Sequence, residues 1–182
     1  MKKYINFLNL GAQPLANNYL RKSQLNKKEI KYNLKVGIDM NTKLVSINKP
    51  LSSRMMFNKN YPYRSSMSKT MVQSSKNLAK IINKKFKPKK ILEIGSNDGC
   101  FIKNFPKNKT IGIEPCSNVE KITKKKGFDT FPEYWNKKTA EKILKKRGKV
   151  DLIYSANTIS HIENLDNVFK SIDILLQKNG IL

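Results

Sequence analysis

Two acidic segments of the sequence could together bind a nucleoside. The first is the run Glu93-Ile94-Gly95-Ser96-Asn97-Asp98-Gly99, which directly follows a pair of apolar residues. The second is Glu114, nineteen residues after Gly95, at the end of another apolar run. A glycine turn after one strand and an acid after the next are typical of nucleoside-binding strand–helix–strand units, in which the carboxylate accepts both ribose hydroxyls. The spacing therefore predicts a nucleoside site.

The same turn argues against a dinucleotide. A pyrophosphate site requires Gly-x-Gly-x-x-Gly, but Asn97 and Cys100 occupy the second and third glycine positions. Two acids beside a pyrophosphate would also repel it. A ligand with an ammonium and a sulfonium group would instead be attracted by Glu93 and Asp98, so we expect a cationic nucleoside ligand.

Alternating strands and helices position these residues from Ser68 onward. Apolar spacing predicts a helix over 68–85 that Pro88 ends, and the short apolar runs predict parallel strands. We expect a short helix from Cys100, a Ser117–Glu120 capping box, a helix over 165–177 that Gly180 ends, and a fifth strand opening at Ile181. The remaining expected elements are strands at 90–94, 110–114, 128–131 and 150–154, a helix from Ser117 to Gly127, and a helix over 137–147. This is an α/β fold, a Rossmann-like doubly wound parallel sheet that is incomplete near its fifth strand.

The first third of the chain has weaker periodicity and turn residues at Gly11, Pro14, Pro50 and Pro62. Short strands over 32–36 and 43–47 are expected there. We therefore expect two domains: a small irregular one over 1–66, with little core of its own, and the doubly wound one over 67–182.

Composition excludes several classes of protein. No apolar run is long enough to span a membrane, and the start of the chain is too interrupted by asparagine for a signal peptide, so we expect a cytoplasmic protein. The net charge of +24 would suit nucleic acid. However, only four of the 37 basic residues are arginine, the side chain best suited to phosphate and guanine, so we disfavour a nucleic-acid partner. Cys100 and Cys116 read as buried thiols.

The run from Ile91 to Gly99 resembles the first motif of class I S-adenosylmethionine-dependent methyltransferases, and Ile113-Glu114-Pro115 resembles their second. Four segments, over 10–17, 61–66, 95–99 and 155–162, are similar in order and content to C-methyltransferases that act on keto forms of nucleotide-linked deoxysugars. The resemblance implies S-adenosylmethionine as cofactor and a small nucleotide-sugar substrate.

The resemblance also implies roles for individual residues. His161 would be the general base that removes a proton beside the ketone, since imidazole titrates in the right range. Tyr61 and Tyr63 would close over the sugar, or alternatively pack the small domain on the large one. Trp135 would be a core residue or pack on the edge of the adenine. The residues expected to bind the cofactor are Glu93, Gly95, Ser96, Asn97, Asp98, Gly99, Glu114, Pro115 and Asn157.

Relatives in this family carry an N-terminal zinc module, with a Cys-x-x-Cys pair where this chain has Asp39 and Thr42. A threonine hydroxyl is a poor zinc ligand, so we expect no metal. The family also carries a further C-terminal part that this sequence lacks, which a complementing fragment could supply. Two alternatives stay open: an RNA methyltransferase, and a truncated, inactive fragment of a sugar methyltransferase.

Overall fold

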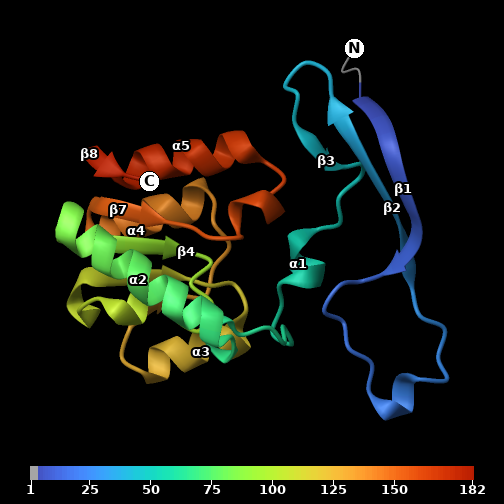
Figure 1. Ribbon diagram of the computed structural model, residues 1–182, viewed down its shortest axis with the longest axis horizontal. Coiled ribbons are helices and arrows are strands. Elements are labelled where there is room, and N and C mark those ends of the chain that lie inside the picture. The colour runs from blue at the N-terminus through green and yellow to red at the C-terminus, as the bar shows by residue number, and fades with distance from the viewer. Residues whose placement is uncertain (1–3) are drawn as a thin grey trace. The chain divides into compact units, whose positions relative to one another are not determined.

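The computed structural model describes residues 4–182, which form two compact units (Figure 1). The first ends at Met56 and the second spans Phe57–Leu182. The expected boundary, at residue 66, lies within the second unit. The reason is that the segment from Phe57 to Ser66 forms hydrogen bonds with residues of the doubly wound domain.

The first unit is a three-stranded antiparallel sheet in the order β1-β2-β3, with β1 at Tyr4–Pro14, β2 at Lys31–Asp39 and β3 at Val45–Ile47. A 3-10 turn at Lys22–Gln24 lies between β1 and β2, and the short helix α1 spans Ser53–Met56. The pairing of β1 with β2 is irregular at two places, between Asn6 and Leu8 and between Asn9 and Ala12. Among residues 4–56 only Gly37 is buried, so this unit has little core.

The second unit is built on a five-stranded parallel sheet in the order β6-β5-β4-β7-β8. This confirms the predicted α/β doubly wound fold. The sheet order reverses at β4, so the carboxyl ends of β4, β5 and β7 meet where ligands bind in such folds. The strands are β4 at Ile91–Ile94, β5 at Thr110–Ile113, β6 at Asp129–Phe131, β7 at Val150–Tyr154 and β8 at Leu176–Ile181.

Helices cover both faces of this sheet (Figure 1). One cluster of buried side chains joins the sheet to α4 (Lys137–Arg147) and α5 (Leu165–Leu175). A second joins the other face to α2 (Lys69–Lys85) and to a 3-10 turn at Ile102–Asn104. Helix α3 spans Ser117–Lys125 and follows β5. The alternation along β4 therefore directs Ile91 into one cluster and Leu92 into the other.

Three local expectations were wrong. Ser117 is not a helix cap: the N-cap of α3 is Cys116, and Glu120 is buried and accepts a hydrogen bond from Thr130 Oγ1 (3.2 Å). The chain between Cys100 and β5 forms no α-helix but two 3-10 turns, at Ile102–Asn104 and Lys107–Lys109, and Asn104 Nδ2 donates to the carbonyls of Cys100 and Phe101. Helix α5 ends at Leu175, and Gly180 lies within β8.

Among residues 4–182, no helix combines the length and the apolar character that crossing a bilayer would require.

Candidate functional site

The turn after β4 is a tight loop in which four backbone amides already donate hydrogen bonds within the protein. Gly95, Asn97 and Gly99 all have positive φ, of 74°, 47° and 81°. The N–H groups of Gly95 and Ser96 donate to the carbonyl of Ile113 (2.8 and 2.9 Å), and that of Gly99 donates to Ser96 (2.9 Å). A pyrophosphate site needs such amides free to point at the ligand. These three amides, together with that of Asn97, which donates to Glu114, are therefore not free to cradle a phosphate.

Glu114 lies against this turn. Its Oε2 accepts the N–H of Asn97 (2.9 Å) and its Oε1 accepts the N–H of Cys116 (2.8 Å). The side chain is buried, and burial raises the pKa of the carboxyl although these hydrogen bonds lower it. The Cys116 thiol also hydrogen-bonds to this carboxyl, and because a carboxylate can accept about four hydrogen bonds, Glu114 keeps capacity for one further donor. Pro115, between Glu114 and the helix cap, is half-buried.

Glu93 occupies a more enclosed position. It lies in β4 opposite Gly112 of β5, and it is buried with an Oε2 atom that has no hydrogen-bond partner among residues 4–182. Burial raises the pKa of Glu93 well above its ordinary value, a backbone N–H from Ile102 lowers it, and the nearby carboxylates of Glu114 and Asp98 raise it further. The three acids therefore share one neighbourhood, but Glu93 is enclosed within it.

Asn97 and Asp98 hold a segment from earlier in the chain. Asn97 Oδ1 accepts the N–H of Ser65 (2.8 Å) and its Nδ2 donates to the carbonyl of Tyr63 (3.3 Å). Asp98 accepts from both the N–H (3.2 Å) and the hydroxyl of Ser66. We call residues 61–66 the strap. The side chains of these two site residues therefore bind the strap and not open solvent.

The strap brings aromatic rings to the same region. Asn118 Nδ2, in α3, donates to the carbonyl of Tyr61 (2.8 Å). Burial raises the pKa of the Tyr61 phenol, and the charges of Cys116 and Glu114 raise it further. Phe57 joins this group, with ring centroids 5.4 Å from Tyr61 and 5.7 Å from His161. Tyr63 packs edge-on against Tyr61 at 6.5 Å.

His161 and Asn157 lie on the segment that follows β7, and both are exposed. His161 ends a 3-10 turn at Ile159–His161, where its N–H donates to Thr158 (2.9 Å). Thr158 lies so close to Gly95 that a Cβ there would come within 2.2 Å of its Oγ1. The structure therefore joins the segment carrying His161 to the turn after β4.

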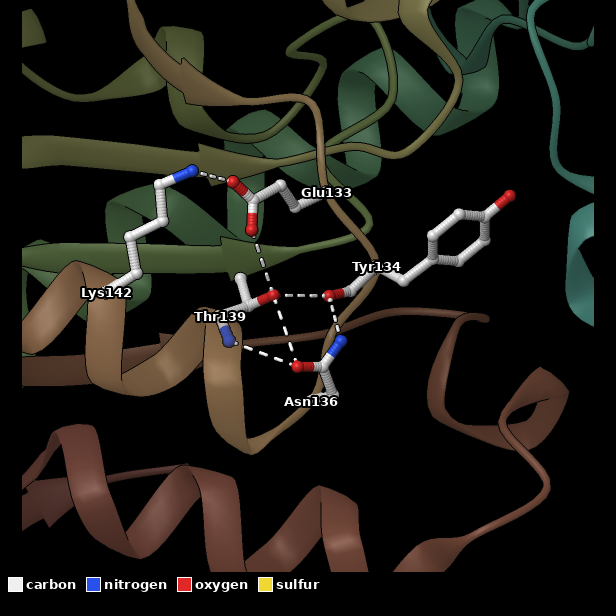
Figure 2. Close-up of polar contacts among 5 residues, drawn as sticks. All are labelled: Glu133, Tyr134, Asn136, Thr139 and Lys142. Atoms are coloured by element: carbon white, nitrogen blue, oxygen red, sulfur yellow. Dashed lines mark hydrogen bonds and ion pairs between the residues drawn. The ribbon is translucent and has the colours of Figure 1, made fainter.

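The segment after β6, residues 133–136, is held in place by a network of hydrogen bonds (Figure 2). Asn136 caps α4 by accepting the N–H of Thr139 (3.1 Å). Thr139 Oγ1 donates to the carbonyl of Tyr134 (2.8 Å) and to Glu133 (3.2 Å). Glu133 is in turn paired with Lys142. The Tyr134 ring points away from this network, and its hydroxyl donates to the carbonyl of Phe57. Anchoring residues 133–136 in this way positions the hydroxyl that holds Phe57, four residues before the strap.

Trp135 is a core residue that donates to the carbonyl of Val168 (3.3 Å). Both cysteines are buried. Burial and the adjacent Glu114 raise the pKa of the Cys116 thiol.

Sequence reasoning missed Phe57, Asn118 and Thr158. Nothing around Phe57 distinguishes it locally, because its place in the site depends on rings distant in the chain. Asn118 was taken as part of the capping box. Thr158 carried a usable signal, since it belongs to the segment over 155–162 that resembles the sugar methyltransferases.

Comparison with known proteins identifies two family matches. Residues 63–182, well over half of the chain, match the family model described as "Methyltransferase domain". Residues 2–57 match the model described as "Putative zinc binding domain". No curated protein sequence matches the chain significantly.

Solved structures are similar to part of the chain. One is a SAM-dependent methyltransferase of Thermotoga maritima, 22% identical with a TM-score of 0.45, over 60% of this chain and 49% of that one. Another is the plantazolicin methyltransferase BamL, solved with a triazolic desmethylPZN analog and SAH, 21% identical with a TM-score of 0.48, over 60% and 44%. The chain spans about half the length of these structures.

The first unit does not fit a zinc ion. Both cysteines and the histidine of the chain lie outside residues 2–57. Asp39 Oδ1 instead accepts the N–H groups of Asn41 (2.8 Å) and Thr42 (3.2 Å), and Thr42 Oγ1 accepts that of Leu44 (3.3 Å). Within residues 4–182, no three histidine, cysteine or acidic side chains are arranged to hold a metal. The turn between β2 and β3 is thus closed by hydrogen bonds.

Proposed function

The chain belongs to the methyltransferase-domain family, and from this premise we propose that it transfers a methyl group from S-adenosylmethionine to a carbon of a nucleotide-linked keto-deoxysugar. The observation that carries the cofactor proposal is the position of Glu114. Its carboxylate is fixed against the turn after β4 by the N–H of Asn97 and keeps capacity for one further donor. Ribose hydroxyls are donors of this kind.

The turn itself supports a cationic nucleoside. Four of its amides already donate to Ile113, Ser96 and Glu114, so these four are not free to bind a diphosphate. Three carboxylates in one neighbourhood favour positive charge. Gly95–Gly99, with Glu93 behind them, would face the methionine end of the cofactor, and Pro115 and Asn157 would border its nucleoside. When bound, the cofactor supplies an electrophilic methyl group on sulfur.

The sugar proposal rests on two features. The segments over 10–17, 61–66 and 155–162 resemble those of sugar methyltransferases, and the rings of Phe57, Tyr61 and Tyr63 lie near His161. His161 is exposed beside Phe57, so it can hold a proton taken from a carbon next to a ketone. Tyr61 and Tyr63 would pack on the sugar ring and exclude water. Positioning of this kind can lower a barrier by roughly 7–11 kcal/mol without a covalent intermediate.

Calorimetry with S-adenosylmethionine tests the cofactor site. We expect Glu114→Gln to weaken binding about tenfold to a hundredfold, because a hydrogen bond to a charged group contributes about 1.5–3 kcal/mol. Glu120→Gln is the matched control, since Glu120 is also buried but lies on α3 and bonds to Thr130. Equal affinity of wild type and Glu114→Gln, with both variants folded by circular dichroism, would overturn the ribose assignment.

Proton exchange tests the substrate separately. A thymidine-diphosphate keto-deoxysugar in D2O should exchange the hydrogen next to its ketone in the presence of the wild-type chain, and His161→Asn should lose this exchange while binding the cofactor normally. Exchange at the wild-type rate in His161→Asn would remove the base assignment. Methylation of RNA, with none of the sugar, would replace the substrate proposal.

A further inference from the structure

A cavity lies at the amino ends of the strands of the parallel sheet, opposite the candidate site. Its volume is about 410 Å³, and its lining comes from the amino ends of β5 and β6, the residue before β4 and the end of α4. The candidate methyl-transfer site lies at the carboxyl ends of the strands, toward which the β4 arrow points in Figure 1. A cavity of this size is within the range of small-molecule sites. It is therefore a separate place for a ligand.

The lining is strongly basic. Lys90, Lys107, Lys109 and Arg147 contribute positive charge, and Asp129 is the one acid among the lining residues. Asp129 is already paired with Arg147, whose Nε lies 2.5 Å from its Oδ2. No acid anywhere in residues 4–182 forms an ion pair with the three lysines. The cavity thus retains three uncompensated positive charges.

Two of these ammonium groups are held at the wall by neutral partners. Lys107 Nζ lies 5.6 Å from the centre of the Phe128 ring, and Lys90 Nζ donates to the carbonyl of Arg147. Neither partner carries a formal charge that would cancel the ammonium. Gly127 adds room, because a Cβ at that position would lie 3.4 Å from Lys107 Nζ. The charges are therefore placed around open space.

We propose that this cavity binds a small phosphate-bearing molecule through Lys90, Lys107 and Lys109. Lysine side chains only donate hydrogen bonds, so a ligand must bring acceptors, and three positive charges match a multiply charged anion better than a neutral one. A polynucleotide would need a continuous basic stripe to follow its backbone, whereas these residues surround a concavity. The diphosphate group is the chemistry that fits charge and size together.

Titration of the full chain with inorganic pyrophosphate at near-physiological salt tests the proposal, with ADP and inorganic phosphate as further arms. The double variant Lys107→Gln, Lys109→Gln removes two of the lysines, and both changes are near the surface. Lys76→Gln, Lys80→Gln is the matched control, because it removes the same charge from exposed positions of α2 that do not line the cavity.

We expect wild type and control to bind pyrophosphate alike, and the cavity variant to bind it at least about tenfold more weakly. Binding of S-adenosylmethionine should be equal in all three, which separates this site from the methyl-transfer site. Equal pyrophosphate affinity in the two double variants would overturn the proposal, as would absence of binding to wild type. Binding of RNA in preference to pyrophosphate, weakened equally by both double variants, would assign the charge to a general nucleic-acid surface instead.

Discussion

The two units of this chain are stabilised in different ways. In residues 4–56 the strands of β1, β2 and β3 pair regularly enough to form a sheet, yet no side chain is buried and large apolar groups such as Phe7 stay exposed. In residues 57–182 both faces of the sheet are covered, and Leu92 and Ile153 are almost inaccessible. The first unit therefore depends on backbone hydrogen bonds and turns, and the second on apolar burial.

The largest contrast should come from truncating an apolar side chain in each unit. We expect Leu92→Ala to lower the free energy of unfolding by about 2–5 kcal/mol, because it leaves a cavity in the core. Phe7→Ala, with a side chain 60% exposed, should change it by no more than about 0.5 kcal/mol. Urea denaturation, followed by hydrogen exchange in peptides of each unit, measures both. A loss from Phe7→Ala equal to that from Leu92→Ala would show that the units do not differ in this way.

Two glycines with nearly the same positive φ, one in each unit, allow a second test of this difference. Gly11 and Gly95 have φ of 72° and 74°, so alanine is strained at both. A Cβ at Gly11 meets nothing within 4 Å, whereas at Gly95 it meets Thr158. We expect Gly11→Ala to cost about 1–2 kcal/mol, from backbone strain alone. Gly95→Ala should cost more and abolish cofactor binding, as thermal melts and calorimetry would show. Equal costs would remove the steric argument at Gly95.

The buried carboxyl of Glu93 should make the free energy of unfolding of the second unit depend on pH. A carboxyl whose pKa is raised on folding binds its proton more tightly in the folded state. Its contribution to stability is complete below the ordinary value of 4.5 and is lost as the pH rises through the folded pKa of Glu93. We expect wild type to lose up to about 1.4 kcal/mol per pH unit in this window relative to Glu93→Gln.

Urea denaturation at several pH values measures this slope. Glu141→Gln, on the exposed side of α4, is the control and should keep the wild-type slope. A wild-type slope in Glu93→Gln would mean that another group carries the pH dependence.

The turn that closes the first unit should give the smallest effect. Asp39→Ala removes the acceptor for the N–H groups of Asn41 and Thr42, and should cost about 1 kcal/mol. Asp39→Asn keeps an acceptor and should recover most of this loss. Because the turn is closed without metal, a chelator should leave the melting temperature unchanged. A melting temperature that falls on chelation would show that the unit does bind a metal.

The sequence predicts the second unit far better than the first. The run Val150–Tyr154 is β7 as predicted, because a parallel strand covered on both faces is a short and mostly apolar run, interrupted here only by Asp151. Strand β1 was missed, since asparagines interrupt its apolar residues and two irregularities disturb the alternation with β2. The helix expected over 165–177 ends two residues earlier, and Ile181 closes β8 where it was expected to open a strand, because the apolar residues of α5 continue directly into Leu176.

The candidate site also has one part that the sequence predicts and one part that it does not. Glu93, the turn and Glu114 could be predicted as neighbours, because parallel strands end at one edge and the spacing is local. The partners of Asn97 and Asp98 could not be predicted. Their hydrogen bonds reach the backbone of residues 63–66, more than thirty positions earlier, and a backbone N–H or carbonyl has no side-chain identity to recognise.

The grip of Asn97 and Asp98 on the strap has a consequence for proteolysis. Arg64 is exposed and basic, so trypsin can recognise it, but the next residue, Ser65, is held by Asn97. A protease needs a loosened, extended backbone at the bond that it cuts. The rate of cleavage after Arg64 therefore reports how often the strap detaches, and a ligand that steadies the turn after β4 should slow it.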